Sequence, residues 1–204
     1  MNNDKHGKRP AVDTGALQPE LIVGIGGSAG ALSAYRAILD AMPYDTGMAF
    51  VIISHMNPTA TSQLVKILSR HTKMNIQSAS MGMQIRANHV YVIPPNADLL
   101  IDKHKFNVIS PRSGRNKQID IFFSSLADAI GERAVGIVLS GYDGDGTEGC
   151  KHIKLKGGHT FAQDTSAEVD FMPLSLQASG FADFVMPLEK IPEKLKRLSA
   201  SLNT

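Results

Sequence analysis

Short apolar runs recur along the chain and predict its strands. The runs 48–53 and 134–139 are continuously apolar, which is typical of strands buried on both faces of a parallel sheet. A third apolar run, 21–24, ends in a cluster of glycines. Shorter β-like runs predict the remaining strands of the sheet: 76–80, 90–93, 160–163 and 184–186.

Segments with helical spacing of apolar positions lie between these strands. The clearest is 118–130, where Ile119, Phe122, Phe123, Leu126 and Ile130 share one helix face. We expect that face to lie in the core. The other predicted helices are 31–42, a segment after Pro58 that includes 64–68, one that ends at 156, and the segments 173–179 and 188–202.

Two apolar runs, 99–101 and 106–109, are separated only by the polar residues 102–105. This close spacing predicts a β-hairpin. Elsewhere strands and helices alternate, which indicates an α/β fold. We therefore predict a doubly wound, mostly parallel sheet with helices on both faces and the hairpin as an insertion.

Composition and charge are those of an ordinary globular protein. Of the 204 residues, 43% are hydrophobic and 20% are charged, and the net charge is only +2. With no basic stripe, this charge argues against nucleic acid as a partner. No run reaches the roughly 18 apolar residues that a membrane helix needs, and the N-terminus has no secretory signal.

Cysteine content and chain length indicate the compartment and the number of domains. Cys150 is the only cysteine, so no internal disulfide can form, which fits a reducing, cytoplasmic location. Residues 1–18 are polar and contain a proline, which predicts a flexible tail. We expect the remaining residues, 19–204, to form one domain.

Residues capable of catalysis follow the predicted ends of three strands. Ser28 follows the first strand, His55 the second, and Asp143 and Asp145 lie in the glycine-rich loop after the run 134–139. A serine hydroxyl needs an imidazole to accept its proton and a carboxylate to orient the imidazole. The carboxyl ends of parallel strands meet at one edge of the sheet, so these residues can form a hydrolase site.

Other interpretations of these residues remain open at this point. A serine such as Ser28 at a strand-to-helix turn is typical of a helix N-cap. Aspartates in a glycine-rich loop, such as Asp143 and Asp145, are typical turn residues. The spacing Gly24-x-Gly26-x-x-Ala29 matches a dinucleotide fingerprint, but no acidic residue ends the second strand. The loop does not have the spacing of a calcium site, and no His/Cys cluster has metal-ligand spacing. We expect neither a metal nor a cofactor.

Three motifs, IGGSAGAL around Ser28, ISHMNP around His55 and VLSGYDGDGTEG around Asp145, resemble a known family. The family is the catalytic domain of the chemotaxis protein-glutamate methylesterases, the CheB type, in particular the version in methylesterase–methyltransferase hybrid sensors. The resemblance extends from residue 21 to about residue 195, through 45–50 and 88–96. The family's usual N-terminal receiver domain is absent from this chain.

The resemblance implies a serine esterase that removes methyl groups from glutamate γ-methyl esters of chemoreceptors and releases methanol. Some members also deamidate glutamines. The family's nucleophile falls on Ser28, its histidine on His55 and its aspartate on Asp145 rather than Asp143. The partners implied are a methylated chemoreceptor or sensor protein and methyltransferase or kinase signalling proteins. For the oxyanion we expect the backbone N–H groups of Ala29 and Tyr142.

Three departures from the family pattern bear on activity. Asp143 stands where a small or neutral residue is usual, Ala31 replaces a glycine, and Leu174 stands where a basic residue often follows the proline. A second carboxylate so near Asp145 can draw His55 into a different contact. A catalytically weak docking module and an esterase of small molecules are therefore the alternative functions.

Overall fold

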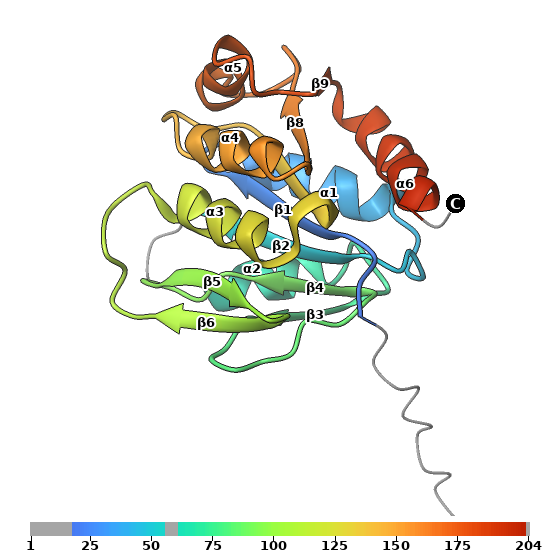
Figure 1. The fold of residues 1–204 in the computed structure, drawn as a ribbon, viewed down its shortest axis with the longest axis vertical. Coiled ribbons are helices and arrows are strands. Elements are labelled where there is room, and N and C mark those ends of the chain that lie inside the picture. The colour runs from blue at the N-terminus through green and yellow to red at the C-terminus, as the bar shows by residue number, and fades with distance from the viewer. Residues whose placement is uncertain (1–17, 56–60, 203–204) are drawn as a thin grey trace, which may run out of the picture.

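A computed structural model describes residues 18–55 and 61–202 and shows one seven-stranded sheet with parallel pairing throughout (Figure 1). The strand order is β3-β4-β2-β1-β7-β8-β9. The chain thus forms the half of the sheet beside β2 first, with β4 inserted between β2 and β3, and then crosses over to fill the other half. The strands are β1 (Ile22–Gly27), β2 (Ala49–Ser54), β3 (Asn75–Ser78), β4 (His89–Val92), β7 (Ala134–Val138), β8 (His159–Gln163) and β9 (Phe184–Met186).

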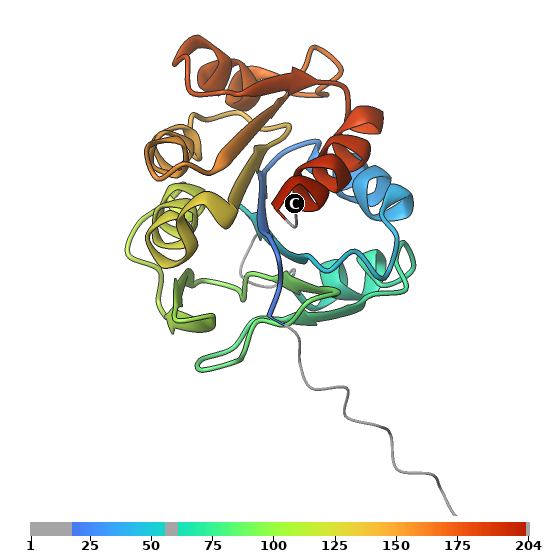
Figure 2. The same ribbon diagram turned by 45° about the vertical axis from the view of Figure 1, so that its right-hand side comes forward.

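Helices cover both faces of this sheet (Figures 1 and 2). One face carries α1 (Ala31–Ala41), α2 (Thr61–Leu68) and α6 (Ile191–Leu202). The other carries α3 (Gln118–Ile130), α4 (Thr147–Leu155) and α5 (Phe171–Ala178). Single 3₁₀ turns at Gly131–Arg133 and Leu188–Lys190 precede β7 and α6. None of the helices in these described ranges is long and apolar enough to cross a membrane.

The continuous apolar strands supply two cores at once because successive side chains point to opposite faces. In β2, Phe50 and Ile52 pack under α1 and α2, whereas Val51 and Ile53 pack under α3. All four side chains are fully buried. This explains why the central strands show no alternation of polar and apolar residues in the sequence.

The predicted hairpin forms a separate antiparallel pair, β5 (Asp98–Asp102) and β6 (Lys105–Ile109), packed against α3. The Ile101 N–H donates a hydrogen bond to the Ser125 hydroxyl on α3. At the other end, buried Asp98 accepts hydrogen bonds from the Ser113 N–H at 2.7 Å and from the Gln118 side chain at 3.0 Å. The hairpin is therefore fixed to the helix that leads into the site.

The predicted α/β architecture is confirmed, with a few shifted boundaries. The first strand was expected to end at Gly24 but continues to Gly27. Gly24 and Gly26 lie in the strand where α3 crosses it closely, and this approach leaves no room for a side chain. A Cβ at Gly24 would lie 2.6 Å from the Phe123 ring. Helix α5 begins at Phe171, two residues before the predicted start, and the C-terminal segment begins as a 3₁₀ turn.

Two parts of the sequence-based interpretation fall outside the structure. All of the predicted tail, 1–18, except Gln18 lies outside the described residues, as does Pro58 before α2. The expected tail and the domain limits at 19–204 therefore stay predictions.

Candidate active site

The three central strands of the sheet, β2, β1 and β7, bring the predicted catalytic residues to one edge. Ser28 directly follows β1, His55 directly follows β2, and Asp145 lies in the loop after β7. Gly27 is paired with Ser54 across β1 and β2, so the Ser28 and His55 positions are in register. Ligands of open parallel sheets bind at this edge, where the strand order reverses.

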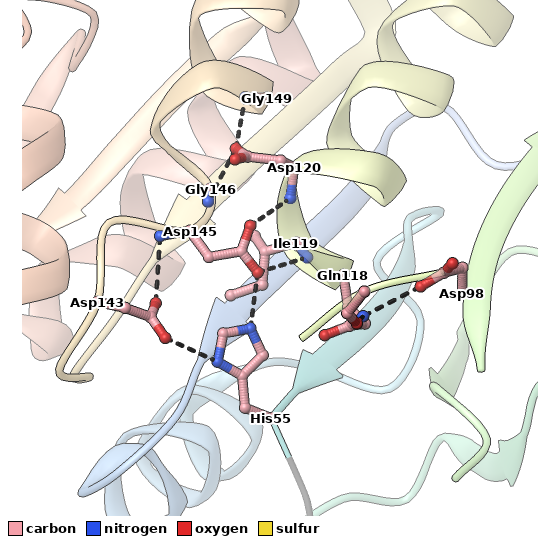
Figure 3. Close-up of polar contacts among 10 residues, drawn as sticks. His55, Asp98, Gln118, Ile119, Asp120, Asp143, Asp145, Gly146 and Gly149 are labelled. Carbon is pink, nitrogen blue, oxygen red and sulfur yellow. Dashed lines mark hydrogen bonds and ion pairs between the residues drawn. The ribbon is translucent and has the colours of Figure 1, made fainter. Parts of the chain in front are cut away.

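His55 and Asp145 form a largely buried polar contact in the site (Figure 3). Nε2 of His55 lies 2.6 Å from Oδ2 of Asp145, and their side chains are 7% and 0% exposed. A buried carboxylate needs further partners, and Asp145 accepts hydrogen bonds from the N–H groups of Ile119 (3.0 Å) and Asp120 (2.9 Å). Both amides belong to the first turn of α3, where a negative charge is favoured.

A second carboxylate, Asp120, supports this arrangement from behind. Its Oδ1 accepts hydrogen bonds from Gly146 N–H (2.9 Å) and Gly149 N–H (2.8 Å) at the start of α4. The two aspartates thus cap each other's helices, Asp145 on α3 and Asp120 on α4. Burial raises the pKa of Asp120 to about 6; the two amides oppose this rise and the charge of Asp145 adds to it.

Asp120 is not among the predicted site residues, because the helical spacing of 118–130 indicated only a core helix. A signal was present. Asp120 is an acidic residue in the first turn of an otherwise apolar helix, a position where carboxylates bind backbone N–H groups. Its partners lie 26 and 29 residues further along the chain, and nothing local in the sequence points to them.

Ser28 is held in place by its backbone. Its N–H donates a hydrogen bond to Ser140 O at 2.8 Å, and the N–H of His55 donates to Gly27 O at 3.3 Å. The Ser140 hydroxyl donates to Ala29 O at 2.7 Å, which ties the segment after Ser28 to the loop that follows β7. Among the described residues the Ser28 side chain makes no hydrogen bond, while its backbone is fixed on both sides.

The helix-cap interpretation of Ser28 is not supported. Gly30, with a left-handed φ of 76°, is the N-cap of α1, and no side chain caps that helix. Ser28 contributes only its backbone carbonyl, which accepts a hydrogen bond from Ala31 N–H at 3.2 Å. The hydroxyl of Ser28 is thus available for chemistry.

Two backbone amides beside Ser28 have no partner among the described residues. The N–H groups of Ala29 and Tyr142 donate to none of the described acceptors, whereas the N–H of Gly141 donates to Val169 O at 2.9 Å. The N–H groups of Ala29 and Tyr142 can therefore donate to a ligand, whereas the N–H of Gly141 is already engaged. Their assignment to an oxyanion stays a prediction.

The ring of His55 is contacted by a second loop carboxylate, Asp143. Oδ2 of Asp143 lies 3.3 Å from Nδ1 of His55, and Oδ1 accepts a hydrogen bond from Asp145 N–H at 3.1 Å (Figure 3). Nδ1 is buried and makes no hydrogen bond within the described part of the chain, so it has none with the Ser28 hydroxyl. The structure therefore brings Ser28, His55 and Asp145 to one edge but shows a direct bond only between the last two.

The acidic side chains of the site are not arranged as a metal centre in the described residues. Within residues 18–55 and 61–202, no group of three or more His, Cys, Asp or Glu side chains is placed to hold a metal ion. The acidic residues of the site instead bind backbone amides and His55, which accounts for their charge without a cation.

Comparison with known proteins identifies the family of the chain. The family model described as CheB methylesterase matches residues 23–195. A putative protein-glutamate methylesterase/protein-glutamine glutaminase of Leptospira interrogans is 34% identical over 178 residues, which cover 85% of this chain and 92% of that protein. A Burkholderia lata protein-glutamate methylesterase/protein-glutamine glutaminase is 31% identical over 98% of this chain, which spans 56% of that protein.

A solved structure agrees with the sequence matches. The crystal structure of the Thermotoga maritima CheB methylesterase catalytic domain superposes with a TM-score of 0.81 at 28% identity. The superposition covers 87% of this chain and 98% of that domain. The family-model match, residues 23–195, includes the ends of all three strands that meet at the candidate site. The chain belongs to the CheB methylesterase family.

Proposed function

We propose that this protein is a serine esterase that hydrolyses glutamate γ-methyl esters on signalling proteins and releases methanol. The single observation that carries the proposal is the buried His55–Asp145 pair at 2.6 Å, beside a serine hydroxyl with no structural role. The names of the relatives, which are protein-glutamate methylesterases, support the substrate class.

The orientation of the imidazole determines which nitrogen acts as the base. Nε2 donates its hydrogen to Asp145, so the proton of the Ser28 hydroxyl passes to Nδ1. As the O–H bond of Ser28 breaks, its Oγ forms a bond to the ester carbonyl carbon. Asp145 stabilises the imidazolium formed in this step, and its two bonds to α3 amides keep it oriented.

The oxyanion that forms on the carbonyl oxygen is stabilised by the free N–H groups of Ala29 and Tyr142. When the tetrahedral intermediate collapses, the bond to the methoxy oxygen breaks, and the leaving group takes the proton from Nδ1 as methanol. The glutamyl group then remains as an ester on Ser28. Water, deprotonated by Nδ1, hydrolyses this ester and restores the enzyme.

The same site supports glutamine deamidation as a second activity. The names of the matched relatives include protein-glutamine glutaminase. An amide takes the same course, with ammonia leaving in place of methanol, provided that Nδ1 delivers its proton to the leaving nitrogen. A single acid–base nitrogen therefore serves both leaving groups.

Methanol release from a methylated receptor peptide tests the proposal. We expect Ser28→Ala to lose activity by at least about 10³-fold, because it removes the proposed nucleophile. Ser33→Ala, which removes an exposed serine from the neighbouring helix α1, is the matched control and should keep the wild-type rate. Wild-type activity in Ser28→Ala would overturn the mechanism.

A sulfonyl fluoride probe separates the proposal from the alternative functions. Covalent labelling of Ser28 in the wild-type protein is expected for an esterase and not for a docking module. Turnover of simple aryl esters without turnover of the methylated peptide would instead indicate an esterase of small molecules. The partner we propose is a methylated chemoreceptor or sensor protein of the kind that CheB-type enzymes modify.

A further inference from the structure

Helix α5 presents apolar side chains to solvent as well as to the core. Its buried face is formed by Met172, Pro173 and Leu176. On its outer face, Phe171 is 59% exposed and Leu174 is 42% exposed. These two residues are three positions apart and therefore share one side of the helix. A helix with one packed face normally carries polar residues on the other, so the outer face of α5 is apolar where solvent alone would favour polar side chains.

This outer face begins next to the proposed nucleophile. The Met172 N–H donates a hydrogen bond to Gly141 O at 2.9 Å, which fixes the start of α5 against the loop after β7. A Cβ at Gly141 would lie 3.1 Å from the Cβ of Ser28, so this loop is in turn packed against Ser28. Tyr142, the next residue of the loop, is 72% exposed. We call these three exposed residues the apolar rim of the site: Tyr142, Phe171 and Leu174.

The charges that accompany the apolar rim are negative. Glu168 and Asp170 are exposed and lie in the segment that leads into α5. A Cβ at Gly30 would lie 2.8 Å from the Cβ of Glu168, so this acidic residue is packed against the start of α1. The sequence contains no lysine or arginine in residues 134–150 or 157–189, the two segments that form this side of the site. The surface beside Ser28 is therefore both apolar and acidic.

Basic residues lie on the other side of the site, in the loop that precedes α3. Figure 3 shows Asp143 and Gln118 on opposite sides of the His55 ring. Arg112 lines a small pocket together with Gln118. The basic residues of this loop are Arg112, Arg115 and Lys117. The two sides of the His55 ring thus differ in the charge that they present, and the acidic character belongs to the side of α5.

We propose that the apolar rim is a docking surface for the substrate, and that it selects a receptor segment with apolar and basic side chains beside the methylated glutamate. This inference rests on the proposed function, because the substrate has to reach Ser28. Apolar side chains of the segment pack on Phe171 and Leu174, since burial of exposed aromatic and aliphatic groups stabilises interfaces. Its lysine or arginine side chains lie near Glu168 and Asp170, where opposite charge favours the correct partner.

Binding of fluorescent peptides to Ser28→Ala tests the rim without turnover. One peptide carries leucine and lysine on both sides of a methyl-esterified glutamate, and the other carries serine and glutamate at the same positions. We expect the leucine–lysine peptide to bind about tenfold more tightly at low salt. The preference should shrink at about 0.5 M salt, because screening weakens its electrostatic part.

Leu174→Arg, introduced into the Ser28→Ala protein, is the decisive variant. It removes an apolar contact and adds a positive charge one helical turn from Asp170, so we expect the preference between the peptides to fall by about tenfold. Phe171→Ser should weaken binding of the leucine–lysine peptide by about threefold to tenfold and leave the other peptide nearly unaffected. Leu155→Ser removes an exposed leucine at the end of α4 far from the site, and this matched control should bind both peptides unchanged.

Sulfonyl fluoride labelling separates docking from damage to the site. In proteins that retain Ser28, Phe171→Ser and Leu174→Arg should be labelled at the wild-type rate, because neither side chain belongs to the proposed acid–base or oxyanion groups. Slower labelling would show a structural role for α5 and overturn the inference.

Outcomes that overturn the docking surface differ from those that overturn the esterase. Equal affinity for the two peptides, or an unchanged preference in Leu174→Arg, would overturn the docking surface even if methanol is released. A preference that depends on Leu174, without methanol release from either peptide by the wild-type protein, would support the docking surface and contradict the esterase function.

Discussion

The two halves of the active site are built in different ways. The acid–base half, His55 with Asp145 and Asp120, is held by carboxylates that bind the amides of α3 and α4. The nucleophile half, around Ser28, is held by backbone hydrogen bonds and by glycines that let other segments of the same chain approach closely. No side chain in the described part of the chain orients the hydroxyl of Ser28.

This difference follows from the charge that each half carries. A buried carboxylate is stable only when hydrogen bonds replace the water it has lost, so the acid–base half must be tightly bonded. A neutral hydroxyl needs no such replacement and gains reactivity from being free to rotate between the base and the substrate. Damage to the first half should therefore affect both stability and activity, and damage to the second should affect activity alone.

The largest effect is expected from Asp145→Asn. An asparagine replaces one carboxylate oxygen by an NH₂ group. At Oδ1 this leaves the Asp120 amide without an acceptor, and at Oδ2 it leaves both the Ile119 amide and the His55 ring without one. With the NH₂ group at Oδ2 the imidazole adopts the wrong tautomer, and we expect kcat to fall by about 10³–10⁴-fold. The buried amide left without a partner should also lower stability by about 1–3 kcal/mol.

Methanol release and thermal unfolding of Asp145→Asn measure these two effects. Asp102→Asn, an exposed aspartate at the end of β5, controls for the change in net charge. A variant that loses activity without loss of stability would show that Asp145 does not serve as the cap of α3. The contrast between the two halves would then fail on the acid–base side.

The next effect is expected from Gly141→Ala in the nucleophile half. A Cβ at Gly141 would lie 3.1 Å from the Cβ of Ser28 and 2.6 Å from the end of the Met172 side chain. The methionine is flexible and can move, but Ser28 would be displaced from the base. A displacement of this kind costs up to about 10²-fold in rate, and we expect little change in Tm.

Gly144→Ala is the matched control because it lies in the same loop and its Cβ would meet nothing closer than 3.7 Å. We expect nearly wild-type methanol release from this variant. Equal losses in both variants would indicate that the loop, and not its contact with Ser28, is sensitive to substitution.

The residues of the two halves of the site could be predicted from the sequence to different extents. Apolar runs indicate the central strands because burial on both faces leaves no polar position, and a parallel sheet then brings Ser28 and His55 to one edge. The choice of Asp145 over Asp143 needed the family resemblance, since both lie in the same loop. The roles of Asp120 and Gly141 were not predicted, because each depends on a segment that folding brings from elsewhere in the chain: α4 for Asp120, and β1 with α5 for Gly141.

The smallest effect, and the one that probes the acid–base half most finely, is the pH dependence introduced by Asp120. Its pKa is raised from 3.8 to about 6, chiefly by burial. Between these values the folded protein keeps a proton that the unfolded chain has lost, so the contribution of Asp120 to stability falls as the pH rises from about 4 to 6. Asp120→Asn should remove this fall.

The asparagine variant is informative because both amides of α4 bind the same oxygen, Oδ1 of Asp120, which asparagine retains. We therefore expect no gain at pH 4 and a gain of about 1 kcal/mol above pH 6, after allowance for solvent screening. For a chain of this size the gain corresponds to about 2–4 °C in Tm. Thermal unfolding between pH 4 and 8 measures it, with Asp102→Asn as the exposed control. Parallel profiles for wild type and Asp120→Asn would mean that the carboxylate behind Asp145 stays ionised throughout, and that the two carboxylates of the acid–base half are not in competition.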